Sequence, residues 1–470
     1  MVEGNQLPPG PRTRAPGGSL WAFRRNPLAL LVDSARFGDI SCFKFGRQWI
    51  YLLNHPDLIR ELIVARAVEV RKSRAIRITK HVLGHGLLTS EGDLHRRQRQ
   101  LAQPAFQPAR VSHYADVMVR HAEEFAESWS DGQRLDIHEQ MMGLTLAVVA
   151  KTLFDAELDV NVKKIARSVS TCVELFDRAM MPWCRWLDFA PLPSNIAFAI
   201  ARKRLTRIVE GMIADRRANP ADRGDFLSIL LEQNNGRPIM SDRQARDEAI
   251  TIFLAGHETT AIALTFAWYA MAKHPEAAKL VYDEVDSVLG DRLPTVEDLP
   301  RLVWVQRVVA ESLRLYPPVW TLGRELLADC EFGNYRVPAR TLVLASQYVM
   351  QRDPRYYSRP ETFDPSRWVP EVAAERPKYA YFPFGAGPRH CIGESFATME
   401  LVLAMATIAR RWRMELPADH QLSLRATITV RPRGGMPVTL HRRTPSVARN
   451  ENDRELIASG PLPPRAEAIS

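Results

Sequence analysis

Cysteine is scarce in this sequence, with five residues in a chain of 470. Cys42, Cys172, Cys184, Cys330 and Cys391 are odd in number, widely scattered and without paired spacing. The pattern therefore fits a soluble protein of the reducing cytoplasm better than a secreted disulfide framework. With 46% hydrophobic residues, a chain of this length buries a large core without crosslinks.

An apolar targeting segment is also lacking. The first eleven residues are polar or rich in proline and glycine, so we expect neither a signal peptide nor a transmembrane anchor at this end. Residues 249–272 are long and apolar enough to cross a membrane, but His257 and Glu258 stand at their centre. Because ionisable groups are costly in lipid, this segment is predicted to be a buried core helix.

Clustered basic charge is the third absence. The net charge is +9, yet lysine and arginine are spread along the chain and no basic run alternates with aromatic residues. We therefore expect no nucleic-acid partner. A basic docking face for an acidic protein and an evenly solvated surface both remain open.

Helical periodicity dominates what is present. Apolar residues recur at spacings of three and four in eight segments: 57–66, 108–130, 138–155, 200–217, 243–273, 275–289, 304–315 and 393–412. Residues 42–53 read as a β-hairpin turning at Gly46, and 322–344 as short extended pieces. We predict a mainly α protein with a small β region. Residues 1–18 are expected to be flexible, 19–443 to form one domain, and 444–470 to be a disordered tail.

The most informative segment is Phe384-Gly385-Ala386-Gly387-Pro388-Arg389-His390-Cys391-Ile392-Gly393, which precedes a long predicted helix. Glycine permits positive φ and close backbone approach, so such a loop can direct amide N–H groups towards a sulfur. The positive end of the helix dipole adds to this effect. Both stabilise a thiolate. The alternative is a free core cysteine in a glycine-rich loop.

This segment resembles the haem-binding signature F-x-x-G-x-R-x-C-x-G of the cytochrome P-450 family at every fixed position, including Gly393. The resemblance implies that Cys391 is the metal ligand of haem b. It also implies that Phe384 packs beside the sulfur and that Arg389 pairs with a haem propionate. The resemblance extends over about residues 20–443, with the motifs in the family's order.

Two further motifs resemble this family. Glu311 and Arg314, three apart on a predicted helix, resemble its E-x-x-R pair, and Arg367 would complete a structural triad. Ser366 stands where the family usually has glutamate. A solvated surface ion pair is the alternative interpretation of a lone E-x-x-R.

The segment Ala255-Gly256-His257-Glu258-Thr259-Thr260 lies inside a long apolar helix. Glycine within a helix costs about 1 kcal/mol relative to alanine, which suggests a specific use. The segment resembles the family's distal-helix pattern, in which Gly256 would open a groove for dioxygen. Glu258 and Thr259 would deliver protons during oxygen activation. A helix–helix contact with a satisfied polar pair is the alternative.

Three basic residues resemble the family's propionate-binding positions: His95 and Arg99, four apart on a predicted helix, and Arg324. Many members have tryptophan at the position of His95. For each of these residues alone, a solvated side chain is the competing interpretation.

The family position of the substrate pocket implies an apolar lining. Its expected members are Val82, Leu83, Leu87, Leu88, Phe253, Ala255, Val319, Trp320 and Leu322. Arg74, Arg77 and Lys80 lie beside one of these segments and could hold a carboxylate, although a solvated loop face is the favoured interpretation of these three residues.

The resemblance implies the fold, a triangular helical prism enclosing haem, and the activity. The expected reaction inserts one oxygen atom from O2 into an apolar lipid, fatty acid, terpenoid or steroid-like molecule. Electrons would come from a separate ferredoxin or flavodoxin with its NAD(P)H-dependent reductase. A haem-thiolate isomerase or dehydratase and a non-catalytic haem protein are the alternatives, and the Glu258–Thr259 pair argues against the first.

Overall fold

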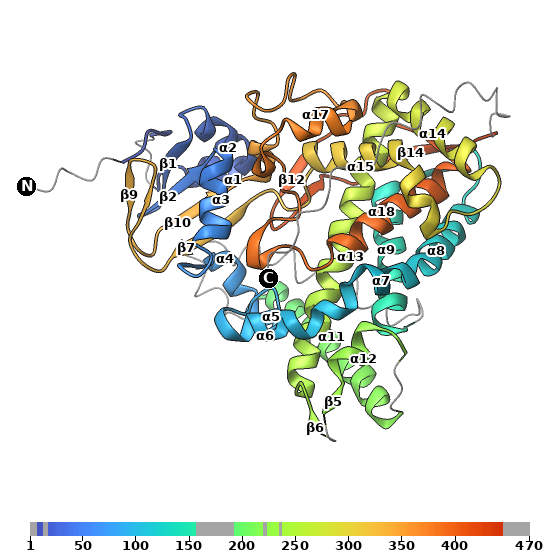
Figure 1. Cartoon of the computed structure of the whole chain (residues 1–470), viewed down its shortest axis with the longest axis horizontal. Coiled ribbons are helices and arrows are strands. Elements are labelled where there is room, and N and C mark those ends of the chain that lie inside the picture. Colours follow the sequence, from blue (N-terminus) through green and yellow to red (C-terminus); the bar gives the residue numbers. More distant parts are fainter. Residues whose placement is uncertain (1–6, 13–16, 157–191, 220–222, 235–236, 445–470) are drawn as a thin grey trace, which may run out of the picture.

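The computed structural model describes residues 7–12, 17–156, 192–219, 223–234 and 237–444. In Figure 1, a lobe built around a β-sheet lies beside a larger helical lobe. Nearly all of the predicted tail at 444–470 lies outside the described residues.

Long helices build the larger lobe. They are α8 (Ala115–Glu127), α9 (Ile137–Phe154), α11 (Pro193–Ala218), α13 (Asp242–Lys273), α14 (Pro275–Leu289), α15 (Val303–Leu315) and α18 (Glu394–Ala409). Shorter helices are α1 (Leu20–Arg25), α2 (Pro27–Ala35), α3 (Pro56–Arg60), α4 (Arg74–Ile78), α5 (Lys80–Leu83), α6 (Gly92–Ala102), α7 (Pro108–Val111), α12 (Phe226–Leu230), α16 (Gln347–Met350) and α17 (Pro370–Ala374). One π-helix, η1 (Glu61–Ala65), continues α3. The 3-10 turns are η2 (Gln103–Phe106), η3 (Ser112–Tyr114), η5 (Val296–Arg301), η6 (Pro365–Trp368), η7 (Lys378–Ala380) and η8 (Gly387–Arg389).

Helix α13 is the central element and packs against α9, α11, α15 and α18. Ser241 caps its start by accepting a hydrogen bond from the Gln244 amide at 3.3 Å. It is the one described helix that is long and apolar enough to span a membrane, but 78% of its most apolar window is buried within the protein. The predicted core helix is therefore confirmed.

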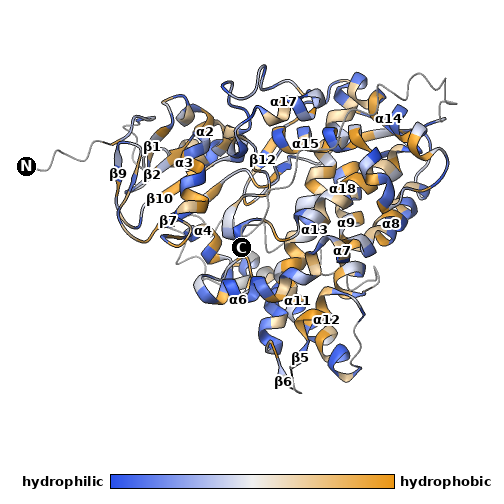
Figure 2. Ribbon diagram, in the orientation of Figure 1, coloured by the Kyte–Doolittle hydropathy of each residue, from blue (hydrophilic) through white to orange (hydrophobic). Residues whose placement is uncertain are grey.

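Helices α18 and α9 carry hydrophobic residues on most of their sides, whereas α6 is largely hydrophilic (Figure 2). A helix that is apolar all round belongs in the interior. Helix α18 packs between α8, α13 and α15, so the segment before its first turn is directed into the middle of the molecule.

The main sheet has the strand order β1-β2-β10-β7-β3. Its strands are β1 (Ile40–Phe45), β2 (Gln48–Leu53), β3 (Val70–Lys72), β7 (Leu322–Leu326) and β10 (Leu342–Ala345). The predicted hairpin is β1–β2, turning at Gly46 with φ of 64°. Strand β10 runs parallel to β2, and β7 pairs antiparallel with both β10 and β3. In that last pair Lys72 stands opposite Arg324, which places two cations side by side.

Smaller sheets complete the fold. Their strands are β4 (Arg134–Asp136), β5 (Gln233–Asn234), β6 (Arg237–Pro238), β8 (Cys330–Phe332), β9 (Tyr335–Val337), β11 (Trp412–Glu415), β12 (Leu424–Ala426), β13 (Val430–Pro432) and β14 (Pro437–Arg442). The hairpin β12–β13 pairs Ala426 with Val430 and reaches back to the helical lobe.

Two predictions need correction. The single helix expected over 108–130 is divided into α7, η3 and α8. The flexible segment expected over 1–18 is in part fixed, because the Cys42 amide and thiol donate hydrogen bonds to the carbonyls of Pro9 at 3.0 Å and Pro8 at 3.1 Å. A Cβ atom at Gly10 would lie 1.9 Å from the Cys42 oxygen, so glycine is what allows this close packing on β1.

Candidate active site

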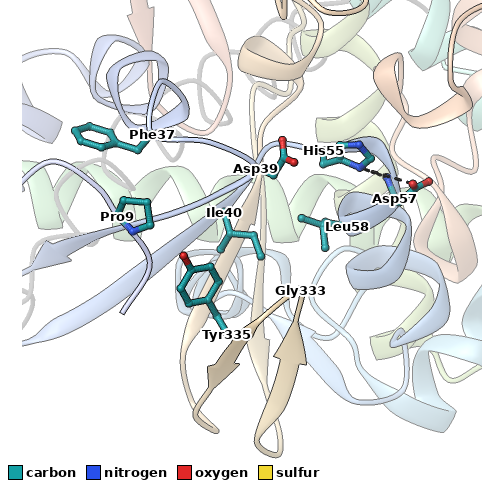
Figure 3. Close-up of a pocket in the computed structure, with 9 residues that line it drawn as sticks. All are labelled: Pro9, Phe37, Asp39, Ile40, His55, Asp57, Leu58, Gly333 and Tyr335. Carbon is teal, nitrogen blue, oxygen red and sulfur yellow. Dashed lines mark hydrogen bonds and ion pairs between the residues drawn. The ribbon is translucent and has the colours of Figure 1, made fainter. Parts of the chain in front are cut away.

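An open cleft of 410 Å³ lies at the edge of the sheet lobe (Figure 3). It is lined by Pro9, Phe37, Asp39, Ile40, His55, Asp57, Leu58, Gly333 and Tyr335. None of these residues belongs to α13, α18 or the loop of residues 384–393 (the cysteine loop), so this cleft is separate from the predicted chemistry.

The cysteine loop is held against the sheet lobe. The Cys391 amide donates a hydrogen bond to the Phe384 carbonyl at 3.0 Å, which closes the loop. Gly387 has φ of 68°, and a Cβ atom there would lie 2.5 Å from the Ile63 oxygen in η1. Only glycine permits both the conformation and the contact. The loop thus delivers Cys391 to the start of α18.

Protein surrounds Cys391, yet its side chain is exposed, so the thiol borders an internal space. Burial raises the pKa of Cys391 to about 11, while the Gly393 amide and Arg99 act in the opposite direction. A thiol in this position stays protonated unless a cation stabilises the thiolate. A coordinated metal ion supplies that charge.

Helix α13, which packs against α18, has an open face. Ala255 is exposed and Gly256 and Thr259 are partly exposed, whereas His257 and Glu258 between them are buried. An exposed alanine in the middle of a core helix marks an internal space. The Thr259 hydroxyl donates to the Ala255 carbonyl at 2.7 Å and remains accessible at this face.

Gly256 has a packing role in addition to its predicted groove. A Cβ atom there would lie 3.1 Å from Val149 of α9, tighter than an ordinary contact. The glycine therefore lets α9 and α13 approach closely.

Glu258 is directed away from the open face. Its Oε1 accepts hydrogen bonds from the Thr429 hydroxyl at 2.6 Å and from Arg431 Nη2 at 2.6 Å and Nε at 3.0 Å. The carboxylate and the Thr259 hydroxyl are therefore neighbours in sequence that lie in different surroundings. Proton delivery by Glu258 stays a prediction, and it would require a water link or a change of side-chain conformation.

A cluster of basic side chains lies beside the cysteine loop. It consists of Lys72, His95, Arg99, Arg324 and Arg389. Burial together with the neighbouring cations lowers the pKa of Lys72 to about 7, of His95 to about 3 and of Arg324 to about 10.

One carboxylate, Glu91, compensates part of this charge by pairing with Arg389 and accepting the Lys72 amide at 2.7 Å. Arg99 donates to the His390 carbonyl at 2.7 Å, which ties α6 to the cysteine loop. Buried cations in such excess need further anions. The two propionates of a haem have the required charge, so the donor set and the cluster fit this group.

The predicted triad is present. Arg314 binds Glu311 through two hydrogen bonds of 2.8 Å, and both side chains are fully buried. Arg367 Nε lies 3.3 Å from Glu311 Oε1, and the Trp368 indole donates to Oε2 at 3.0 Å. Ser366, where the family usually has glutamate, donates its hydroxyl to Asp364 at 2.5 Å.

Arg314 also donates to three carbonyls of the following loops, those of Gln351 (2.8 Å), Pro360 (2.7 Å) and Thr362 (3.1 Å). The triad therefore joins α15 to the segment that leads towards the cysteine loop.

The predicted pocket residues differ in their surroundings. Leu322 lies 3.6 Å from the position of a Cβ atom at Gly385, beside the cysteine loop. Val319 and Leu322 are partly exposed, Leu88 is exposed, and Leu83 and Leu87 are buried. The side chain of Val82 lies outside the described part of the chain.

Two of these predictions need correction. Trp320 is buried against Phe23 and its indole donates to the Thr427 carbonyl at 2.9 Å, so its side chain does not border an open space. Phe253 packs on Phe154 at 5.7 Å between ring centroids. Residues two apart lie on nearly opposite sides of a helix, so Phe253 cannot share the face of Ala255.

Sequence reasoning missed Lys72, Glu91, Thr429 and Arg431. Each lies in a short strand or loop without a distinctive spacing, and Arg431 is 173 positions from its partner Glu258. No local pattern could have indicated these contacts.

The sequence is similar to proteins of a known family. The family model "Cytochrome P450" matches residues 8–436. Cyclooctatin synthase of Streptomyces melanosporofaciens is 39% identical, over 91% of this chain and 93% of that protein. Pentalenene oxygenase of Streptomyces avermitilis is 31% identical, over 91% and 96%.

Solved structures show the same fold. The heme domain of cytochrome P450DA aligns with a TM-score of 0.83 at 24% identity, over 93% of this chain and 98% of that one. The retinoic acid-bound cyanobacterial CYP120A1 aligns with a TM-score of 0.82 at 26% identity, over 94% and 100%.

Proposed function

Since the chain belongs to the cytochrome P450 family, we propose that Cys391 and the open face of α13 form the two walls of its active site. The protein is a haem-dependent monooxygenase that inserts one oxygen atom from O2 into an apolar organic substrate, with electrons from a redox partner. The observation that carries the site assignment is the pair of exposed positions, Cys391 and Ala255, on elements that pack in the core.

In this assignment Cys391 would hold the iron of haem b, and Lys72, His95, Arg99, Arg324 and Arg389 would hold its propionates. When bound, the haem supplies the oxidising chemistry, which a thiolate ligand favours by donating electron density. Phe384 and Gly393 flank the sulfur, and the Gly393 amide donates a hydrogen bond to it. The hydrogen bond moderates the charge on the thiolate.

The protein's own residues supply position and protons. The Thr259 hydroxyl, accessible on the open face, would orient water and hold a proton there. Glu258, which precedes Thr259 in the sequence and is bound by Arg431, is the acid that would supply this proton. The surrounding apolar side chains exclude bulk water from this reaction.

We propose a terpenoid as the substrate. Relatives named cyclooctatin synthase, cyclooctat-9-en-7-ol 5-monooxygenase and pentalenene oxygenase support this class, at 39%, 37% and 31% identity. The basic anchor for a fatty acid is weakened, because Arg77 donates to Glu325 at 2.7 Å and to the Lys72 carbonyl at 2.8 Å. Burial of apolar surface, at about 25 cal/mol per Å², then dominates binding.

Titration of the haem Soret band with cyclic terpenes, terpene alcohols, steroids and fatty acids tests both assignments. We expect shifts with the terpenes and terpene alcohols, and a red-shifted reduced carbon monoxide complex that Cys391→Ala abolishes. A thiolate spectrum that survives Cys391→Ala would contradict the ligand assignment. A shift with fatty acids but not with their methyl esters would indicate that the substrate is a fatty acid and not a terpenoid.

The redox partner is proposed to be a separate ferredoxin or flavodoxin, reduced by its NAD(P)H-dependent reductase. The basic net charge of +9 suits an acidic partner of this kind. We also propose that the enzyme works in the cytoplasm, which the burial of α13, the one long apolar helix among the described residues, supports.

A further inference from the structure

The loop of residues 84–90, between α5 and α6, is held from two sides by buried charged groups. We propose that Asp247 and Glu248 of α13 and Lys72 of β3 are positioning residues that fix this loop against α13 and so limit the size of the molecule that reaches the open face. This inference rests on the proposed active site and deepens it, because it assigns residues that set substrate selectivity.

On the side of α13, two adjacent acids bind the loop; together with Lys72 on the side of β3, they are called the clamp. Asp247 Oδ2 accepts a hydrogen bond from the His85 amide at 2.9 Å, and Glu248 Oε2 accepts one from the Leu87 amide at 2.8 Å. Both acids are buried, at 4% and 1% exposure. Two alternate amides of the loop, those of His85 and Leu87, are therefore satisfied by the helix rather than by water.

The β3 side uses one lysine. Lys72 Nζ donates to the Leu87 carbonyl at 2.9 Å and to the Ser90 carbonyl at 2.8 Å, and Lys72 is 6% exposed. The Leu87 amide is thus bound by Glu248 of α13, and the Leu87 carbonyl by Lys72 of β3. Gln98 of α6 adds a bond of 2.6 Å to the His85 carbonyl.

The position of the contact links the loop to the active site. A Cβ atom at Gly86 would lie 2.0 Å from the Thr251 hydroxyl, so the loop backbone touches α13 at Thr251. Glu248, Thr251, Ala255 and Thr259 follow the helical repeat of three and four and share one face. The loop therefore covers this face up to one turn before Ala255, where the face opens.

Charged groups are a costly way to attach a loop if attachment is their only role. Burying a charge costs several kcal/mol unless it is fully paired, and apolar side chains of the same size would pack at lower cost. Glu248 Oε1 and the Thr251 hydroxyl have no hydrogen-bond partner in the described structure. Directional hydrogen bonds to backbone amides fix the loop's conformation in a way that apolar packing does not, which suits a wall that selects by shape.

The first test measures azole binding to the iron of the haem-loaded enzyme through the Soret shift. Imidazole, 4-phenylimidazole and 1-tritylimidazole form a series of increasing size. Glu248→Leu removes the acceptor for Leu87, and Glu248→Gln keeps an acceptor oxygen. We expect the Kd ratio of 1-tritylimidazole to imidazole to fall about tenfold in Glu248→Leu and to stay near wild type in Glu248→Gln.

The outcomes separate this inference from the proposed function. Failure of wild-type enzyme to bind imidazole at the iron would count against the active site itself. If Glu248→Leu binds imidazole normally and its Kd ratio of 1-tritylimidazole to imidazole is unchanged, only the proposed role of the clamp would be contradicted.

A second variant reaches the loop without changing charge. Gly86→Ala places a Cβ atom against Thr251 and should lower the size ratio as Glu248→Leu does. Gly211→Ala is the matched control, because a Cβ atom at Gly211 of α11 meets nothing within 4 Å.

Hydrogen exchange of the two amides measures the clamp directly. The His85 and Leu87 amides should exchange about tenfold faster in Gly86→Ala than in wild type or Gly211→Ala, because opening of the loop becomes easier. Equal exchange in all three proteins would show that Gly86 and its contact do not hold the loop.

Discussion

Thr259 and Thr260 are adjacent residues with the same local hydrogen bond and different surroundings. Each hydroxyl donates to the carbonyl four residues earlier, Ala255 at 2.7 Å and Gly256 at 2.9 Å. Thr259 is partly exposed at the open face of α13, whereas Thr260 is 3% exposed and turned into the core. A proton-delivering role is open to the first hydroxyl and closed to the second.

Thr259→Ala should therefore uncouple the enzyme. Without the hydroxyl, the ordered path for protons to bound dioxygen is lost, and reducing equivalents are spent on hydrogen peroxide. We expect the ratio of product formed to NAD(P)H consumed to fall about tenfold or more, since general-acid assistance typically contributes about 10²- to 10⁴-fold to a rate. Thr259→Ser should restore most of it.

Thr260→Ala is the control for helix stability, since it removes the same type of hydrogen bond on the buried side. If both alanine variants are equally uncoupled, the hydroxyl of Thr259 acts through helix structure and not through protons.

The motif A-G-x-E-T predicts that Gly256, Glu258 and Thr259 lie near an oxygen site, which stays a prediction, and it does not indicate how their side chains are arranged. Glu258 follows the helix to the side facing β13, where Arg431 and Thr429 bind it. A helical wheel gives the direction of Glu258, whereas its partners lie in a hairpin whose position depends on the whole fold. Residue chemistry was thus predictable and residue pairing was not.

At the scale of elements, the triad of Glu311, Arg314 and Arg367 joins α15 to η6 and the loops between them. Arg314→Ala leaves the Glu311 carboxylate buried with one remaining arginine and frees three backbone carbonyls. Loss of one partner of a buried ion pair costs about 3–5 kcal/mol. We expect a large fall in the thermal unfolding temperature and loss of bound haem, measured by calorimetry and absorbance.

Arg301→Ala is a suitable comparison. Arg301 is also in an ion pair, with Asp298 at 3.5 Å, but its side chain is 57% exposed. Such pairs contribute about 0–1 kcal/mol. A similar loss of stability in both variants would mean that burial does not distinguish the triad.

Helices were predicted well where apolar periodicity is long and uninterrupted, as in α13, α14 and α15. The segment 108–130 shows why boundaries fail: its spacing of apolar residues continues, yet the backbone changes from α7 through the 3-10 turn η3 to α8. The change accommodates Tyr114, whose ring packs on Phe396 of α18 at 5.9 Å. Strands β11, β12 and β13 have only three or four residues, which is too short to produce a periodic signal.

At the scale of the whole molecule, the active site is assembled from segments that span most of the chain. The basic cluster alone combines β3, α6, β7 and the cysteine loop, between Lys72 and Arg389. Periodicity cannot bring such segments together. The family resemblance supplied the topology, and the motif at 384–393 was specific enough to carry it.

We expect electron delivery to depend on the charge around the cysteine loop. Helix α3 contacts η7, and η1 contacts η8, so the exposed Arg60 and Lys378 lie near this loop. An acidic redox protein would be attracted to this surface. Attraction between exposed charges is screened beyond about 10 Å at 0.1 M salt.

We therefore expect the second-order rate of electron transfer from a ferredoxin to fall as ionic strength rises. At low salt, Arg60→Gln and Lys378→Gln should each lower this rate about two- to fivefold, because each removes one attractive charge from the encounter. Arg243→Gln is the control: it removes the same charge from the exposed start of α13, away from the cysteine loop. Stopped-flow reduction of the carbon monoxide-trapped enzyme gives the rate. Equal losses in all three variants would mean that net charge, not this surface, attracts the partner, and a rate independent of salt would exclude steering altogether.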